Sequence, residues 1–375
     1  MQPGFDGVTR VLYKLIENIK KTEVESIVFS PIIPSQEEQP IKMYTVPSFP
    51  FPLYKDYKLA ILAKRYFEDI LKKFNPDIIH INSPCSLGFA AVRFGRKHNT
   101  PVVATYHTHF PSYAKYYKIK ALEQFAWNYL RSLYNKCEAV YVPSMPIIKE
   151  LEEQGIEKTV FLPHGVDTNA FSPSFKSQKW KEEINCQDKK VILFAGRLVW
   201  EKDLKVLADA YKIIMNQRDD ASFVLVGDGP IRKELEELMP KAVFLGYQSG
   251  ENLSRTFASS DIFAFPSTTE TFGNVTIEAM ASGVPPICVE KGGAYGVIRN
   301  KKTGLIAKPD DAEDFAAKII SLLDDDSTRN QISLNALGFA QSQSWENIFG
   351  ELLKSYKNII HKFNESSIYK AVKAA

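Results

Sequence analysis

Two glutamates that stand eight residues apart, Glu270 and Glu278, have the surroundings in this chain that best suit chemistry. The apolar run 261–265 predicts a buried strand, and residues 274–282 predict a helix that ends at Gly283. The first glutamate is therefore expected on a loop that leaves a strand, and the second inside the next helix. Ligands of open α/β sheets bind beyond the carboxyl ends of the strands, so both carboxylates can meet one substrate.

The alternative interpretation is one exposed loop acid and one helix-surface acid without a common role. Gly273 and Asn274 place backbone N–H groups at the start of the predicted helix. A helix start of this kind suits an anion such as a phosphate. The residues between the two glutamates therefore favour a binding site.

A second set of residues can hold a phosphate. Arg197 and Lys202 follow the predicted strand 190–195. An arginine fork binds phosphate oxygens bidentately, lysine adds a point charge, and both neutralise charge that grows on a leaving phosphate. The alternative is a solvated basic pair at a strand end. Strand 222–226 leads into the turn that begins at Gly227, a weak signal alone because any tight strand-to-helix turn has this composition.

Size and composition are those of an ordinary globular protein of two domains. The chain has 375 residues, 45% of them hydrophobic, and a net charge of +3, too small to imply nucleic acid. It contains no apolar run of about 18 residues and no secretory signal pattern at Met1. The four cysteines are far apart and lack metal-ligand spacing, so reduced thiols are expected: Cys85, Cys137, Cys186 and Cys288.

Strands and helices alternate along both halves of the chain, which predicts two doubly wound parallel sheets, each a Rossmann-like α/β domain. The domains are expected at 1–168 and 190–350, with an irregular linker at 169–189 and a terminal helix at 351–375. The predicted strands are 26–33, 76–82, 101–106, 139–143, 160–162, 190–195, 222–226, 242–245, 261–265, 286–289 and 304–306. The predicted helices are 9–19, 57–74, 87–98, 202–215, 230–239, 252–259, 274–282 and 345–363.

Residues 190 to 310 resemble, in order, the motifs of the retaining glycosyltransferases of family 4, which have the two-domain GT-B fold. The motifs are G-R-x4-K at 196–202, V-G-x-G at 226–229 and E-x7-E at 270–278. The resemblance implies two domains that face a cleft and a last helix that crosses back to the first domain. It also implies that Arg197 and Lys202 hold the donor pyrophosphate, and that Gly227 lets the nucleotide approach the backbone.

The same resemblance assigns roles around the two glutamates. Glu270 is expected at the donor hexose, which it orients, and Glu278 at the ribose hydroxyls. Backbone N–H groups of Phe272, Gly273 and Asn274 are expected to meet the sugar or phosphate.

His107 matches the Tyr/Phe-His-Thr step of related enzymes. There the histidine contacts the hexose, or its carbonyl faces the anomeric carbon. His109 is a weaker candidate for the acceptor. A histidine at a strand end can otherwise be a purely structural polar group.

The N-terminal segment 4–10 resembles the family's G-G-V-x-R element, with Asp6 in place of one glycine. Gly7 is expected to bring a backbone N–H to the donor phosphate or acceptor. Arg10 either binds an acceptor phosphate or faces solvent. Family members have a strand before this element, so we expect either a start upstream of Met1 or a sheet without its central strand. Many members carry an acid where Gly296 stands, and Gly296 is given no role.

Residues 110–136 mix aromatic and basic side chains against one acid, Glu123, which suits an anionic membrane surface. The alternative is an amphipathic helix that buries its aromatics in the core. The apolar, proline-rich segment 46–54 is expected to line the acceptor groove. The aromatic and basic residues of 110–136 are Tyr113, Lys115, Tyr116, Tyr117, Lys118, Lys120, Phe125, Trp127, Tyr129, Arg131, Tyr134 and Lys136.

The resemblance implies transfer of mannose or glucose from a nucleotide-diphosphate sugar to a lipid or glycan hydroxyl, with retention, without a metal and without a cofactor. A cytoplasmic enzyme is expected, at the inner face of the membrane where the acceptor is a lipid. Two other classes stay open: a nucleotide-sugar epimerase of the same architecture and a non-catalytic nucleotide-sugar-binding protein. The choice between GDP and UDP, the linkage and the oligomeric state also stay open.

Overall fold

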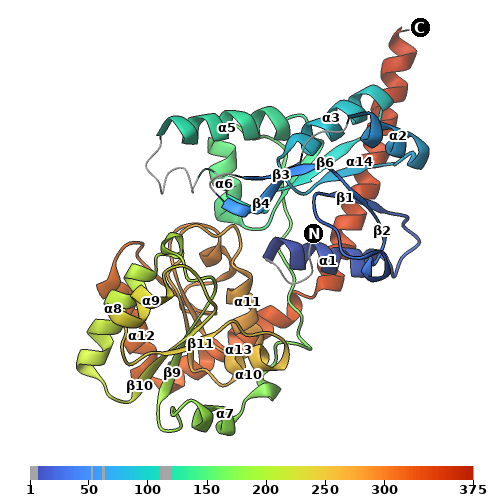
Figure 1. The fold of residues 1–375 in the computed structure, drawn as a ribbon. Helices are drawn as coiled ribbons and strands as arrows, with labels where there is room; N and C mark the ends of the chain where they lie inside the picture. Colours follow the sequence, from blue (N-terminus) through green and yellow to red (C-terminus); the bar gives the residue numbers. More distant parts are fainter. Residues whose placement is uncertain (1–6, 52–53, 61–63, 110, 112–119, 375) are drawn as a thin grey trace.

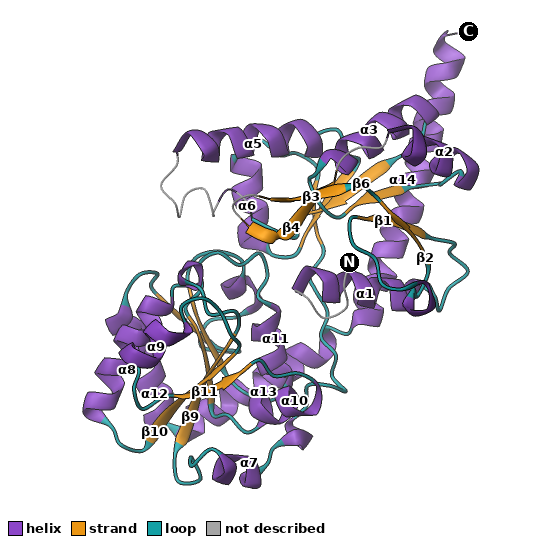
Figure 2. Cartoon of the chain, viewed as in Figure 1, coloured by secondary structure: helices purple, strands orange, loops and turns teal. Residues whose placement is uncertain are grey.

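The computed structural model describes residues 7–51, 54–60, 64–109, 111 and 120–374, and these form two α/β domains (Figure 1). Both domains are built on parallel strands with helices packed against them, as predicted (Figure 2).

The second domain contains one six-stranded parallel sheet. Its strands, in the order β11-β10-β9-β12-β13-β14, reverse their progression between β9 and β12. Such a reversal opens a crevice at the carboxyl ends of the two central strands. Apolar side chains fill both faces, because all residues of β10 and β12 are buried. The strands are β9 (Lys190–Ala195), β10 (Ala221–Val226), β11 (Val243–Gly246), β12 (Ile262–Phe265), β13 (Pro286–Val289) and β14 (Leu305–Ala307).

The four helices predicted between 202 and 282 lie close to their predicted positions, and further helices occupy 178–183, 312–324 and 326–342, where no helix bounds were predicted. The segment 169–189, expected to be irregular, contains α7, whose Trp180 packs into the core of the second domain. The helical elements are η2 (Pro173–Phe175), α7 (Gln178–Glu183), η3 (Trp200–Lys202), α8 (Leu204–Gln217), α9 (Arg232–Leu238), α10 (Gly250–Ala258), α11 (Asn274–Ala281), η4 (Ala294–Val297), α12 (Ala312–Asp324) and α13 (Asp326–Ser342).

The first domain has a four-stranded parallel sheet in the order β5-β6-β7-β8 and a separate parallel pair, β1 with β2. Within the described residues no hydrogen-bonded ladder joins β1 to β5. The strands are β1 (Ile27–Ser30), β2 (Lys42–Thr45), β5 (Ile79–Ile81), β6 (Val102–Thr105), β7 (Ala139–Val142) and β8 (Thr159–Phe161). The helices are α1 (Gly7–Ile19), η1 (Gln36–Glu38), α2 (Lys64–Phe74), α3 (Ser86–His98), α5 (Lys120–Tyr134) and α6 (Met145–Glu153).

One predicted element is wrong in its first part. Residues 57–60 belong to β4 (Tyr54–Ala60), which pairs antiparallel with β3 (Ser48–Phe51), and the helix begins at Lys64. The segment 46–54, expected to be a loop, supplies the partner strand. Pairing between segments overrode the local helical pattern, as tertiary context often does.

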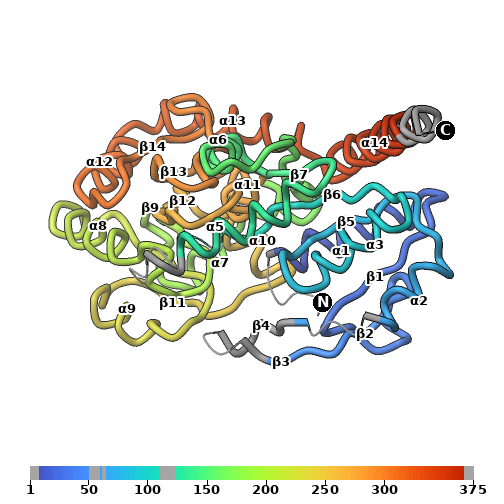
Figure 3. The backbone as a smooth tube through the Cα atoms, turned by 90° about the horizontal axis from the view of Figure 1, so that it is seen from above, coloured from blue at the N-terminus to red at the C-terminus, as the bar shows by residue number. Residues whose placement is uncertain are grey.

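The last helix, α14 (Trp345–Ala374), crosses from the second domain to the first, as predicted (Figures 1 and 3). Phe349 and Leu352 pack with Val103 of β6 and Tyr141 of β7. The helix is longer than the predicted 345–363. It therefore belongs to the core of the first domain while its start adjoins the second.

Candidate active site

The two central strands of the second domain place the predicted phosphate-binding and hexose-binding residues side by side. Arg197 follows β9, and Glu270 lies on the loop after β12. Lys202, at the end of η3, donates from Nζ to Oε1 of Glu270. The side chains of Lys202 and Glu270 are 20% and 24% exposed, so the pair is largely shielded but open to a ligand. Arg197 is exposed at the same edge of the sheet.

Gly227 has a structural role in addition to the predicted one, which stays a prediction. Its φ is +122°, and a Cβ at this position would overlap the carbonyl oxygen of Gly196. Its N–H donates to the carbonyl of Gly246 at 2.8 Å. Glycine is therefore required so that the turns after β9 and β10 can touch, and this packing supports the turn that carries Arg197.

The E-x7-E segment forms a loop and a helix start, as expected. Gly273 caps α11 with φ +78°, and its missing Cβ makes room for Ala294. Phe272 is buried, while Asn274 begins the helix. The first N–H groups of a helix have no partner inside it, so they are available to an anion.

Glu278 is buried inside α11, with 8% of the residue exposed. Its Oε1 accepts from Nη1 of Arg10 on α1 at 3.4 Å, while its Oε2 has no partner among the described residues. Burial raises the pKa of Glu278, and the charge of Arg10 opposes that rise. Arg10 therefore contacts the second glutamate, an arrangement that neither sequence-based alternative included. Gly7 begins the same helix, at the first described residue.

The first domain faces the E-x7-E segment with polar side chains, which we call the first-domain wall. They follow the strands of its four-stranded sheet. Asn82 follows β5, His107 follows β6, Ser144 follows β7 and His164 follows β8. Nε2 of His107 lies 3.1 Å from Oδ1 of Asn82, and its buried Nδ1 has no partner within the described residues.

Three hydrogen bonds join this wall to the E-x7-E segment. The Thr271 hydroxyl donates to the carbonyl of His107 at 2.8 Å, and the Ser144 hydroxyl donates to the carbonyl of Thr271 at 2.8 Å. Nδ1 of His164 lies 2.8 Å from Oδ1 of Asn274. The structure therefore brings His107 next to the segment that carries Glu270.

Both histidines of this wall are neutral imidazoles at neutral pH. Burial lowers the pKa of His164 to about 4. Burial, together with the nearby His164 and His80, lowers the pKa of His107 well below its usual range. A neutral ring can accept a hydrogen bond as well as donate one, so it suits a sugar hydroxyl.

His109 does not belong to this wall. It is buried, with Nδ1 2.6 Å from the Tyr106 hydroxyl and Nε2 3.2 Å from Oε1 of Glu150. Its predicted contact with an acceptor is replaced by contacts inside the first domain. The sequence interpretation missed Asn82, Ser144, Thr271 and His164. Asn82 is the last residue of a predicted strand, Ser144 directly follows one, and His164 lies two residues after one.

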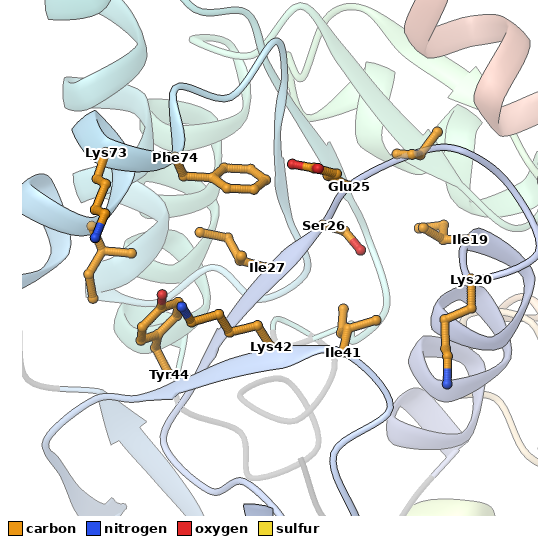
Figure 4. A pocket seen from close by; sticks show the side chains of 12 residues that line it. Ile19, Lys20, Glu25, Ser26, Ile27, Ile41, Lys42, Tyr44, Lys73 and Phe74 are labelled. Atoms are coloured by element: carbon orange, nitrogen blue, oxygen red, sulfur yellow. The ribbon is translucent and has the colours of Figure 1, made fainter.

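The largest cavity that we describe, about 560 Å³, lies away from this cleft, between β1, β2 and the ends of α1 and α2. Figure 4 shows Lys73 and Phe74 of α2 above Ile27 of β1, with Lys42 and Tyr44 of β2 below it. Within the described residues, no group of three or more His, Cys, Asp or Glu side chains has the arrangement of a metal site.

The arrangement of the two walls is that of a GT-B enzyme, and comparison with known proteins defines the family. Glycosyltransferase Family 4 matches residues 5–170, and Glycosyl transferases group 1 matches residues 176–338. A GDP-mannose-dependent alpha-mannosyltransferase of Corynebacterium glutamicum is 31% identical over 96% of this chain and 87% of its own length. The chain therefore belongs to the family 4 GT-B glycosyltransferases, and it is a hexosyltransferase.

Two further proteins show the breadth of this likeness. An alpha-monoglucosyldiacylglycerol synthase of Streptococcus pneumoniae is 28% identical over 71% of this chain and 65% of its own length. The Anabaena protein HepE, solved in complex with UDP, superposes with a TM-score of 0.76 at 20% identity, over 95% of this chain and 97% of its own. The second comparison supports the predicted fold.

Proposed function

We propose that the protein transfers a hexose from a nucleotide-diphosphate sugar to a lipid hydroxyl, with retention of the α configuration and without a metal ion. The observation that carries this proposal is that Thr271, the residue after Glu270, donates to the carbonyl of His107, while Glu270 itself accepts from Lys202. The second domain offers the cations Arg197 and Lys202 for a diphosphate. The first domain offers hydrogen-bonding side chains for a sugar.

The donor fits the second domain in three parts. Arg197, Lys202 and the first N–H groups of α11 take the diphosphate, because all of them donate hydrogen bonds to anions. The ribose lies at Glu278, whose Oε2 has no partner among the described residues and accepts from a hydroxyl. The hexose then lies between Glu270 and His107, with Glu270 holding it in orientation.

In the reaction the bond between the anomeric carbon and the phosphate oxygen breaks, and the acceptor oxygen bonds to the same face of that carbon. The acceptor proton passes to a phosphate oxygen of the leaving nucleotide. Arg197 and Lys202 stabilise the charge that develops on the diphosphate, which is the role a metal plays elsewhere. Closure of the cleft excludes water, which favours transfer over hydrolysis.

The relatives narrow the donor and acceptor. The Corynebacterium relative, matched over nearly the whole chain, is named as GDP-mannose-dependent, and we therefore propose GDP-mannose as donor, with UDP-glucose as the second candidate. The pneumococcal relative is named for glucosyldiacylglycerol, which supports a lipid acceptor.

Membrane contact through 110–136 remains part of this proposal, on a smaller set of residues. Trp127 and Tyr134 of α5 are buried in the core, whereas Phe125 on the same helix is 66% exposed. Residues 110 and 112–119 lie outside the described residues. No described helix is long and apolar enough to span a bilayer. The contact that we propose is a peripheral one.

The test is a transfer assay with GDP-mannose and UDP-glucose, each with and without lipid extract and with EDTA. We expect lipid-dependent release of one nucleoside diphosphate that survives EDTA, and an α-linked product by NMR. A Glu270→Gln variant is expected to lose activity, while Glu313→Gln, an exposed residue of α12, retains it. A β-linked product, a requirement for added metal, or turnover of the sugar nucleotide without nucleotide release would contradict the proposal; the last result is that of an epimerase.

A further inference from the structure

Thr271 is hydrogen-bonded to the first domain through its hydroxyl and its carbonyl. Its hydroxyl donates to the carbonyl of His107, and its carbonyl accepts from the hydroxyl of Ser144, each at 2.8 Å. Thr271 is 8% exposed and Ser144 1% exposed, so water does not readily replace either bond. These contacts lie directly beside Glu270 in the sequence.

The two sides of the hexose site belong to different domains, so their relative position depends on what bridges them. His107 follows β6 and Ser144 follows the neighbouring strand β7. Thr271 is held by both strand ends at once, and it is covalently joined to Glu270. A small displacement of Thr271 would therefore move Glu270 relative to His107.

We propose that Thr271 is a positioning residue, which aligns Glu270 with His107 when the cleft closes. This inference rests on the proposed function, because it concerns the hexose side of the same site. The His107 carbonyl has two lone pairs, and the Thr271 hydroxyl takes one, which orients the carbonyl without blocking the other. The nucleotide side, Arg197 and Lys202, lies within the second domain and does not depend on this bridge.

Gly296 has a related role at the same contact. A Cβ on Gly296 would lie 2.8 Å from Cδ of Pro146 and 3.3 Å from Cβ of Ser144. Glycine at this position therefore lets η4 approach the start of α6 and brings Ser144 to Thr271. A larger side chain at position 296 would hold the two domains apart in this arrangement.

The test compares Thr271→Val, which keeps the shape and loses the hydroxyl, with Thr271→Ser, which keeps the hydroxyl. We expect kcat to fall about 10–100-fold in Thr271→Val, since misplacement by about 1 Å can cost that much. The Kd of the free nucleoside diphosphate, measured by calorimetry, is expected to stay within about twofold, because the nucleotide is bound by the second domain. Thr271→Ser should recover most of the rate.

The matched control is Thr256→Val, which removes another buried hydroxyl of the second domain, one that bonds within α10. It is expected to retain the wild-type rate. Wild-type turnover in Thr271→Val, failure of Thr271→Ser to recover the rate, or an equal loss of nucleotide affinity would each overturn the proposal. Should Thr271→Val not fold, Ser144→Ala removes the second bond of the bridge and carries the same expectation with a smaller loss.

A readout without catalysis separates this inference from the proposed function. Small-angle scattering is expected to show a larger radius of gyration for Thr271→Val than for the wild type, both with bound nucleotide. If the wild type transfers no sugar, the proposed function fails while scattering still tests the bridge. If the wild type transfers sugar and Thr271→Val and Ser144→Ala both match it in rate and radius of gyration, the role of Thr271 is refuted.

Discussion

The ion pair between Arg10 and Glu278 makes a prediction about stability that depends on pH. Glu278 is a buried carboxylate, and Arg10 is the cation that lies 3.4 Å from it, on a helix of the other domain. Arg10→Gln removes the charge and keeps a polar side chain of similar length. The carboxylate is then left in a buried site without a counter-charge.

The magnitude follows from how exposed the pair is. Loss of one partner from a fully buried pair costs about 3–5 kcal/mol, while a fully exposed pair contributes about 0–1 kcal/mol. The side chains of Arg10 and Glu278 are 46% and 10% exposed. Solvent screens the half-exposed guanidinium, so we expect Arg10→Gln to lower the free energy of unfolding by about 1–2 kcal/mol at neutral pH.

The sign of the pH dependence follows from the pKa of Glu278. Burial raises that pKa in the folded protein, and removal of Arg10 raises it further. A carboxyl whose folded pKa exceeds its unfolded pKa favours folding at low pH and loses this contribution as pH rises through the folded pKa. The deficit of Arg10→Gln is therefore largest above the folded pKa of Glu278 and shrinks as the pH is lowered through it.

Urea denaturation at pH 8 and pH 5 measures this difference, with Arg65→Gln as the control because Arg65 on α2 is 96% exposed. We expect Arg65→Gln to match the wild type at both pH values. In a Glu278→Gln background, Arg10→Gln should have little further effect. An Arg10→Gln deficit that is equal at pH 8 and pH 5, or that persists without the Glu278 carboxylate, would refute the reasoning.

Three further predictions concern the site and its support. Lys202→Gln is expected to lower kcat/KM about 100–1,000-fold, as loss of a preorganised charge at the leaving group does, without change in the melting temperature; steady-state kinetics with GDP-mannose tests this. Gly227→Ala should lower the free energy of unfolding by more than about 2 kcal/mol, because its Cβ would overlap Gly196. Gly338→Ala in α13 should leave the free energy of unfolding unchanged or raise it, because there is open space around Gly338. Urea denaturation of both variants tests this. Burial lowers the pKa of His164 to about 4, so its contribution to stability is present above the unfolded pKa of about 6.5 and is lost as pH falls toward 4. Urea denaturation across this pH range should show a smaller acid-induced loss of stability in His164→Gln than in the wild type. The loss should be unchanged in His361→Gln, because the His361 side chain is 74% exposed.

Much of the second domain follows directly from local sequence. The predicted strands 190–195, 222–226 and 261–265 agree with β9, β10 and β12 to within one residue, because continuous apolar runs become fully buried strands. The turns after these strands contain the charged residues that we expected at the sheet edge. By contrast, residues 57–60 form a strand because a partner segment pairs with them, and a local pattern carries no record of that partner.

In the candidate site, contacts within one domain could be predicted from the sequence, and contacts between the domains could not. Lys202 and Glu270 come from adjacent strand ends of one sheet, so parallel topology predicts that they approach each other. Contacts between the domains join positions that are far apart in the chain: 164 residues between His107 and Thr271, and 268 between Arg10 and Glu278. Spacing and periodicity cannot predict these pairs, because they depend on how two separately folded sheets are docked.

This division has a consequence for catalysis. Most residues expected to hold the nucleotide, such as Arg197, Lys202 and Glu278, belong to the second domain, with Gly7 of the first domain as an exception, while the hexose side needs His107 from the first. Nucleotide affinity therefore depends mainly on contacts inside one sheet domain, and the rate of sugar transfer depends on how that domain is docked on the other. Substitutions at the docking contacts should then separate the two quantities, which substitutions at Lys202 cannot do, since its ammonium group donates to Glu270 and is the group that we propose to bind the diphosphate.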